Sequence, residues 1–126
     1  MARGIDLWAA QIVLEKKKEN PDILLICVKP MDNQGYNFPE EDKKTYDMII
    51  SLSDNVISTS ESYSKNCYMK RNKYMVDHSD LLIAFVKNYR SGTGQTINYA
   101  KKQNVDSDIT DLSDIEYQMN YLQLSL

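Results

Sequence analysis

An unbroken apolar run, Leu-Leu-Ile-Ala-Phe-Val at residues 81–86, constrains the fold more than any other stretch of this 126-residue sequence. The run is short enough for one strand, and a strand that is apolar on both faces belongs inside a parallel sheet with helices above and below it. A polar turn with two glycines follows and leads into a helical segment at residues 97–102. The sequence therefore predicts a three-layer α/β domain with a mostly parallel sheet.

The glycine turn at residues 90–96 is the first candidate for a binding site. The free N–H groups of a helix start at the carboxyl end of a strand suit an anion, most often a phosphate. Hydroxyl groups of Ser91, Thr93 and Thr96 would add donors. The turn has neither the Gly-Lys-Ser/Thr of a Walker loop nor a full G-x-G-x-x-G pattern. A tight turn that binds nothing explains the glycines as well, because turns use glycine for its backbone freedom.

The remaining pattern predicts one domain over residues 1–126, with a core at 1–105 and an acidic segment at 106–126 that ends in an amphipathic helix. Strands are expected at residues 23–28 and 55–59, an edge strand after residue 104, and helices from residue 39 and over residues 67–77. A first helix buries one stripe of apolar side chains at helical spacing, formed by Ile5, Trp8, Ala9, Ile12 and Val13.

Two further segments offer polar groups for a site. On the helix at 67–77, Arg71 and Asn72 share a predicted inward stripe with Tyr68 and Met75. A buried guanidinium needs a carboxylate, backbone carbonyls or a ligand phosphate, and arginine suits each of these partners. In the loop at 31–39, Gln34, together with Tyr36 and Phe38, is predicted to line a pocket, although a surface loop with a hydrophobic anchor fits the same residues.

Composition and spacing exclude several functions. The net charge is −3 with both signs interspersed, which disfavours a duplex DNA partner. No apolar run is long enough to cross a membrane, and two cysteines at unrelated spacing fit thiols in a reducing cytoplasm. We expect no bound metal, since His78 is the only histidine. No cofactor is expected either. Cys67 and His78 stand about 16 Å apart along one helix, too far for a catalytic pair, and His78 is expected to interact with the last carbonyls of that helix.

Several blocks together resemble the YpsA-like branch of the SLOG superfamily. They are Ala2-Arg3-Gly4-Ile5-Asp6, Ile26-Cys27-Val28-Lys29-Pro30, Gln34, Lys70-Arg71-Asn72-Lys73-Tyr74-Met75-Val76-Asp77 and Ser91-Gly92-Thr93-Gly94-Gln95-Thr96-Ile97-Asn98-Tyr99-Ala100. The resemblance covers about residues 2–105 and implies a Rossmann-like fold that binds nucleotides or nucleotide derivatives, related to DprA and to the lonely-guy phosphoribohydrolases.

The sequence departs from that family pattern at two points. Relatives of this type open with a strand, a loop, a helix and a second strand before the part that matches residue 2, so the resemblance implies an N-terminally truncated fold. We expect its open strand edges to be satisfied in a homodimer or higher oligomer. Phosphoribohydrolases of the lonely-guy type carry a glutamate after the glycine turn, where this chain has Asn98. Asparagine is no general acid or base, so Asn98 is expected to contact ligand instead.

The first hypothesis is a nucleotide-binding module, possibly for an ADP-ribose derivative, that senses or sequesters its ligand. Arg71 would pair with phosphate or with Asp77. One alternative is an enzyme that hydrolyses the N-glycosidic bond of a nucleoside monophosphate, with Asp6 or Asp77 as the catalytic carboxylate. The other is a scaffold protein without a ligand. The binding residues expected under the first hypothesis are Gly4, Asp6, Gln34, Arg71, Asn72, Ser91, Gly92, Thr93, Gly94, Thr96 and Asn98.

Overall fold

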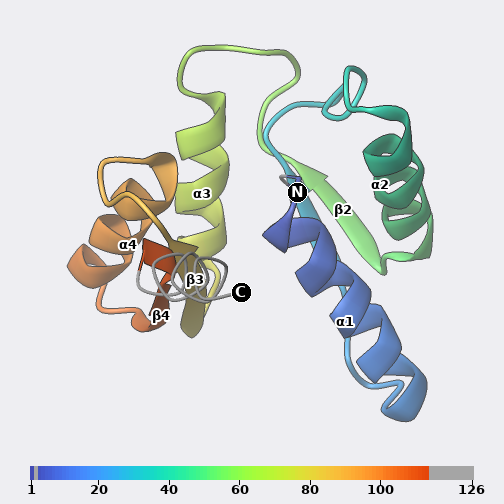
Figure 1. Ribbon diagram of the computed structural model, residues 1–126, viewed down its shortest axis with the longest axis horizontal. Coiled ribbons are helices and arrows are strands. Elements are labelled where there is room, and N and C mark those ends of the chain that lie inside the picture. Colours follow the sequence, from blue (N-terminus) through green and yellow to red (C-terminus); the bar gives the residue numbers. More distant parts are fainter. Residues whose placement is uncertain (2, 114–126) are drawn as a thin grey trace, which may run out of the picture. The chain divides into compact units, whose positions relative to one another are not determined.

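Helices and strands alternate along the chain, as the sequence predicts. The computed structural model describes residues 1 and 3–113. The elements are α1 (Ile5–Glu19), β1 (Ile26–Lys29), α2 (Glu40–Leu52), β2 (Asn55–Ser58), α3 (Cys67–Asp77), β3 (Leu81–Val86), α4 (Gly92–Lys102) and β4 (Asp106–Asp111) (Figure 1). Strand β1 pairs with β2 and β3 pairs with β4, both in parallel. The predicted α/β class with parallel strands is confirmed. The predicted C-terminal helix lies outside the described residues.

The chain divides into two compact units, Met1–Arg71 and Asn72–Leu126, and the boundary falls inside α3. Each unit holds one two-stranded parallel sheet with helices packed on it. That both units form one domain over residues 1–126 stays a prediction.

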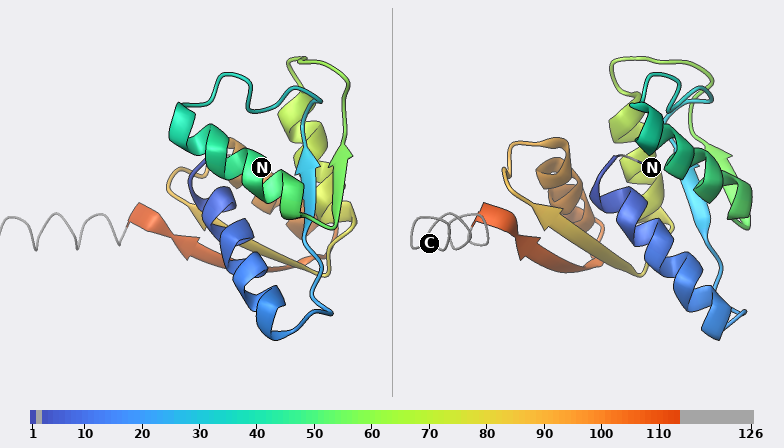
Figure 2. Two further views of the ribbon diagram at one scale, coloured as in Figure 1. Left: turned by 90° about the vertical axis from the view of Figure 1, so that its right-hand side faces the viewer. Right: turned by 45° about the vertical axis from the view of Figure 1, so that its right-hand side comes forward.

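The first unit is built on β1 and β2, which lie side by side and point the same way (Figure 2). Parallel neighbours need a crossover connection, and α2 supplies it. The core between the sheet and helices α1 and α2 comprises Leu7, Ala10, Leu25, Cys27, Tyr46 and Ile49, with Met1 at its margin. Asp54, directly before β2, connects these layers because its carboxylate accepts from the Leu25 N–H at 2.8 Å and pairs with Lys17 of α1.

The predicted inward stripe of α1 is wrong. Leu7 and Ala10 are the buried residues of this helix, whereas Trp8 is 66 % exposed and Ile12 is 60 % exposed. The cause is that α1 carries apolar side chains around more than half of its circumference. Helical spacing alone is therefore consistent with two overlapping apolar stripes and does not show which of them faces the core. The second stripe, which ends in partly buried Val13 and Leu14, packs on the core.

In the second unit α4 covers one face of the β3–β4 sheet (Figure 2). Ala84, Val86 and Ile97 form its core, with Leu82 and Ile109 packed against them. Strand β3 was expected to have helices on both faces, yet the side chains on its other face are exposed. Alternate side chains on that face, those of Leu81, Ile83 and Phe85, are 52 %, 62 % and 40 % exposed.

Helix α3 also differs from its predicted orientation. Arg71 is buried as expected, but its predicted neighbours Tyr68 and Met75 are exposed. The positions that pack inward with Arg71 are Cys67 and Val76. Apolar residues occur on both sides of this helix, so the spacing of apolar residues does not predict which face is buried.

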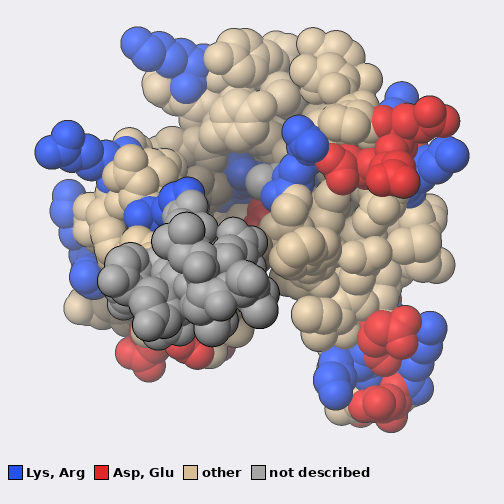
Figure 3. Space-filling view, in the orientation of Figure 1, with Lys and Arg blue, Asp and Glu red and all other residues tan. Residues whose placement is uncertain are grey.

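On the face shown in Figure 3, acidic and basic side chains lie together at the upper right and lower right, and the upper left carries basic side chains. Among the described residues, no helix is long and apolar enough to cross a membrane. Within the same residues, no cluster of three or more histidine, cysteine or acidic side chains is arranged to hold a metal ion.

Candidate functional site

The turn between β3 and α4 has the geometry of a capped helix start. Ser91 is the N-cap: its backbone is extended and its Oγ accepts from the Gly94 N–H at 3.3 Å. The first intrahelical bond runs from the Gln95 N–H to the Ser91 carbonyl at 3.0 Å. The amides of Gly92 and Thr93 come before that bond and point out of the helix start. The helix was expected only from residue 97, but the Ser91 cap lets it begin at the first glycine.

The two glycines of the turn have different roles. A Cβ atom on Gly94 would stand 1.9 Å from the Tyr89 carbonyl oxygen, so close approach of the backbone requires glycine there. Gly92 has no atom within 4 Å of its would-be Cβ, and it does not have a positive φ. The packing of the described residues therefore explains Gly94 but not Gly92. Gly92 is exposed, and the space around its would-be Cβ is open.

The polar side chains of the turn are only partly available. Thr96 Oγ1 donates to the Gly92 carbonyl at 2.9 Å, so this hydroxyl belongs to the helix. Thr93 and Asn98 are exposed. Asn72, in the same unit, is partly buried on α3.

Two cations that the sequence analysis did not select lie near the turn. Lys87 directly follows β3 and Arg90 directly precedes the Ser91 cap, and both are exposed. The feature of the sequence that could have identified these two cations is their position directly after the apolar run of β3. Asp111 is paired in register with Val86 and so lies at the same end of the sheet. Its carboxylate accepts from the Ser113 backbone and hydroxyl, and these bonds lower its pKa.

A second polar cluster lies in the first unit at the end of β1. Arg71 is 6 % exposed, and its guanidinium donates to the Val28 carbonyl at 3.4 Å. Burial lowers the pKa of Arg71, while the charge of Asp6 acts in the opposite direction. A guanidinium group is not deprotonated in proteins, so Arg71 keeps its positive charge. Of the partners expected for Arg71, the structure supplies a backbone carbonyl and a nearby carboxylate.

Gln34 is held inside the protein rather than at an open pocket. It is 8 % exposed, and its Oε1 accepts from the Tyr46 hydroxyl at 3.2 Å and from the Met1 nitrogen at 3.0 Å. Burial raises the pKa of Tyr46 to about 12. Phe38 meets the Tyr46 ring edge-on at 5.5 Å, so it is the anchor of this loop. Tyr36 is 67 % exposed.

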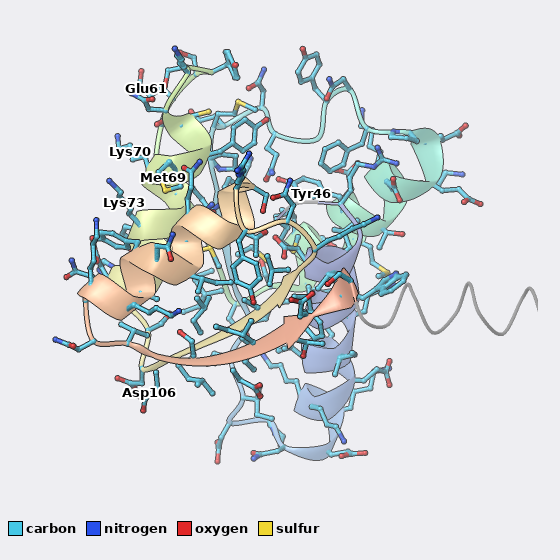
Figure 4. The ribbon with its side chains drawn as sticks, turned by 60° about the vertical axis from the view of Figure 1, so that its left-hand side comes forward. Tyr46, Glu61, Met69, Lys70, Lys73 and Asp106 are labelled. Carbon is cyan, nitrogen blue, oxygen red and sulfur yellow. The ribbon has the colours of Figure 1, made fainter. Side chains whose placement is uncertain are left out.

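Tyr46 of α2 is the contact of Gln34 that the sequence analysis did not identify. Its ring also lies 3.1 Å from the would-be Cβ of Gly35, whose φ is 93°. Figure 4 labels Tyr46 on α2. A glycine is thus needed at this bend of the loop both for its φ and for the space taken by the ring.

Gly4 and Asp6 lie at the start of α1. Gly4 has a φ of 77°, and its carbonyl accepts the first intrahelical bond, from the Trp8 N–H at 3.1 Å. No side chain caps this helix start. Asp6 stands in the first turn, where a carboxylate is favoured by the helix dipole, and its charge acts on Arg71.

Asp77, the last residue of α3, has a hydrogen-bond partner on α4. Its Oδ1 accepts from the Tyr99 hydroxyl of α4 at 2.7 Å, and Lys73 lies 5.3 Å above the same ring. Figure 4 shows Lys73 on α3 next to Lys70. Residues six apart on a helix lie on different faces, which does not favour the expected pairing of Asp77 with Arg71. The predicted role of His78 is confirmed, because its Nδ1 lies 2.8 Å from the Tyr74 carbonyl oxygen.

The candidate residues thus fall into two groups. Asp6, Gln34 and Arg71 gather in the first unit, which also holds Gly4, and the glycine turn belongs to the second unit together with Asn72, Asp77 and Asn98. Parallel strands, crossover helices and a glycine turn after a strand define the class of protein, which is Rossmann-like α/β.

Comparison with known proteins refines that class. Residues 2–120 match the YspA SLOG family, and the chain belongs to this family. It is 31 % identical over 102 residues to a UPF0398 protein of Bacillus cereus strain B4264, with 79 % of the chain and 55 % of the relative covered. It is also 31 % identical over 113 residues to the SPbeta prophage-derived protein YoqJ of Bacillus subtilis strain 168, covering 80 % of the chain and 66 % of YoqJ. The chain therefore spans only 55 % and 66 % of the lengths of these relatives.

Proposed function

We propose that the chain is a nucleotide-binding module that holds a phosphate group of its ligand at the start of α4. The observation that carries this proposal is the pair of amides at Gly92 and Thr93, which precede the first intrahelical bond under an open surface. Two N–H groups at the positive end of a helix dipole form a suitable environment for an anion.

Three features support a phosphate there. Lys87 and Arg90 lie in the loop between β3 and the Ser91 cap, and both are exposed cationic residues. Gly92 is a glycine without a steric or conformational reason in its surroundings, which fits a backbone approached closely by a ligand. The chain belongs to the SLOG family. The resemblance to that superfamily implies nucleotides or their derivatives, such as ADP-ribose, as the ligand class.

A role in sensing or sequestering the ligand fits this site better than hydrolysis. A general acid or base must be free to exchange a proton with the substrate. Asp77 already accepts a hydrogen bond from Tyr99, and Asn98 has no titratable group. Asp6 acts electrostatically on the buried Arg71.

The test is a thermal-shift panel of AMP, ADP, ADP-ribose, NAD and pyrophosphate, followed by calorimetric titration of any compound that raises Tm. A ligand present at 100 times its Kd stabilises the folded protein by about 2.7 kcal/mol. Gly92→Ala should abolish the shift without loss of fold, because the added Cβ meets no protein atom within 4 Å and takes up part of the open space that we assign to the phosphate. Gln103→Ala, at the other end of α4, is the control and should keep the shift.

The outcomes separate the candidate functions. A shift that persists in Gly92→Ala would place the ligand elsewhere and refute the proposed site. No shift with any compound would favour the scaffold alternative. Release of free base from AMP, lost in Asp77→Asn, would show that the chain is a hydrolase.

A further inference from the structure

Each of the two units carries an exposed apolar surface that no described element of the same unit covers. The α1 stripe consists of Trp8, Ile12 and Lys16, which are spaced four residues apart on one side of the helix. The β3 face consists of Leu81, Ile83 and Phe85, together with Asp106 and Asp108 of the neighbouring strand β4.

The α1 stripe is an apolar surface with a basic end. Trp8 and Ile12 are 66 % and 60 % exposed, and Lys16 follows them one turn later. The only ion pair of Lys16 in the described chain is with Glu19 at 3.7 Å, between two exposed side chains. Such a pair contributes little, so the ammonium group can exchange partners at low cost.

The β3 face is an apolar stripe beside an acidic one. The parallel register places Leu81 next to Asp106 and Ile83 next to Asp108 on the same face of the sheet. Both aspartates are exposed, and Figure 4 shows Asp106 at the beginning of β4. A strand with the sequence of β3 normally has helices on both faces, and α4 covers only one of them.

The two surfaces match in length. Trp8 and Lys16 are separated by about 12 Å along a helix at 1.5 Å per residue. Phe85 and Leu81 are separated by about 13 Å along a strand at 3.3 Å per residue. A helix that runs opposite to β3 therefore sets Trp8 over Phe85 and Ile12 over Ile83.

In that arrangement the charges also match. Lys16 arrives at the Leu81 end of the strand, where Asp106 lies beside it. If the helix ran in the same direction as β3, Lys16 would lie at the Phe85 end, next to Thr110, and the contact with Asp106 would be lost. Charge complementarity thus selects one direction of the helix on the sheet.

We propose that the α1 stripe of one copy of this chain packs on the β3 face of a second copy. Each copy carries both surfaces, so the contact is made twice when the two copies close about a two-fold axis, and this closed dimer is the assembly that we propose. Each dimer then buries two aromatic side chains per copy, Trp8 and Phe85, and such residues dominate the energy of protein interfaces.

The experiment uses the whole chain and three matched variants. Light scattering after size exclusion gives the mass, and the fluorescence of Trp8, the only tryptophan, reports its burial across a dilution series. Ile12→Asp and Ile83→Asp should each raise the dimer Kd by about tenfold or more, since an aspartate would be buried in the apolar contact. Met48→Asp makes the same kind of change at a 45 % exposed site on α2 and should leave the dimer intact.

Mixing distinguishes a contact between copies from one made within a single chain. Ile12→Asp retains an intact β3 face and Ile83→Asp retains an intact α1 stripe. Their mixture should therefore recover one of the two contacts and form a heterodimer that neither variant forms alone at the same concentration. A monomeric mass for the unmodified chain, an unchanged dimer in both variants, or no association on mixing would each overturn the proposal.

Charge reversal tests the direction of packing without touching the apolar surface. Lys16→Glu and Asp106→Lys should each weaken the dimer about two- to fivefold, as expected for an exposed ion pair. The double variant should regain the affinity of the unmodified chain. Additive weakening in the double variant would show that the helix does not run opposite to β3.

Discussion

Gly94 and Tyr89 approach each other so closely that a Cβ atom on Gly94 would stand 1.9 Å from the Tyr89 carbonyl oxygen and 2.6 Å from its Cα. The start of α4 is therefore packed directly on the backbone of the turn that precedes it. This contact brings the helix start to the carboxyl end of β3, where the candidate site lies. It also makes the glycine necessary whether or not a ligand binds.

Gly94→Ala should destabilise the protein by about 1–3 kcal/mol, because the overlap with backbone atoms can be relieved only by moving the turn. Urea unfolding followed by circular dichroism measures the loss. Gly92→Ala is the matched control and should be neutral or stabilising by up to about 1 kcal/mol, since alanine favours a helix over glycine and has open space there. Equal losses in both variants would contradict the assigned contact.

Ser91→Ala should cost about 1 kcal/mol, because the Gly94 N–H loses the side-chain oxygen that caps the helix. Ser91→Asp should restore the cap through its carboxylate. Amide hydrogen exchange of Gly94 is the local readout and should speed up in Ser91→Ala. A global loss of stability without faster exchange at Gly94 would argue against the capping role.

Arg71→Met should destabilise the first unit by about 1–3 kcal/mol, since the buried Val28 carbonyl loses a donor. Methionine keeps much of the aliphatic volume, so the loss reports the polar contacts rather than a cavity. Urea unfolding is the measurement, and Lys70→Met, at an exposed position on the same helix, is the control. An Arg71→Met protein as stable as the unmodified chain would show that the guanidinium contributes no net stability.

Because of Tyr46, the free energy of unfolding should depend on pH in the alkaline range. Burial raises its pKa in the folded protein to about 12, above the ordinary value of 10.0. Above pH 10 the unfolded chain releases this proton while the folded protein retains it, so the free energy of unfolding falls as pH rises towards 12. The full effect is about 2–3 kcal/mol, since one pKa unit corresponds to 1.36 kcal/mol.

Tyr46→Phe removes this contribution and should flatten the fall in unfolding free energy between pH 10 and pH 12, as measured by urea unfolding at fixed pH. The same substitution also removes the hydroxyl that donates to Gln34 and should lower stability at neutral pH by about 1 kcal/mol. Tyr36→Phe, at a 67 % exposed ring, should leave the pH dependence unchanged. Parallel curves for the unmodified chain and Tyr46→Phe would refute the burial effect.

Local patterns predicted most of the elements. The six-residue strand Leu81–Val86 and the helix Cys67–Asp77 begin and end at the predicted residues, because apolar length and flanking polar residues act locally. The helix start at Gly92 was missed, since the decisive contact is the Ser91 hydroxyl on the Gly94 amide. Glycine weakens a helix by propensity, and a cap that offsets this is visible only in the geometry.

The candidate site was predicted less completely. Arg71 was expected to be buried and is, but its acceptor, the Val28 carbonyl, lies 43 residues away in the sequence. Gln34 was expected at a pocket and is instead bonded to Tyr46 of α2. No pattern of residue types specifies such partners, because they depend on which faces of separate elements meet.

The sequence by itself determined the α/β class, the order of the elements and the position of the glycine turn after a buried strand, since these follow from short-range periodicity and backbone preferences. The tertiary structure alone decided which stripe of α1 packs inward and leaves Trp8 exposed. It also decided which glycine is required by a neighbouring carbonyl and which polar groups satisfy one another. Burial and hydrogen bonding are properties of surfaces that meet in space, and an amphipathic pattern specifies only that a surface needs a partner.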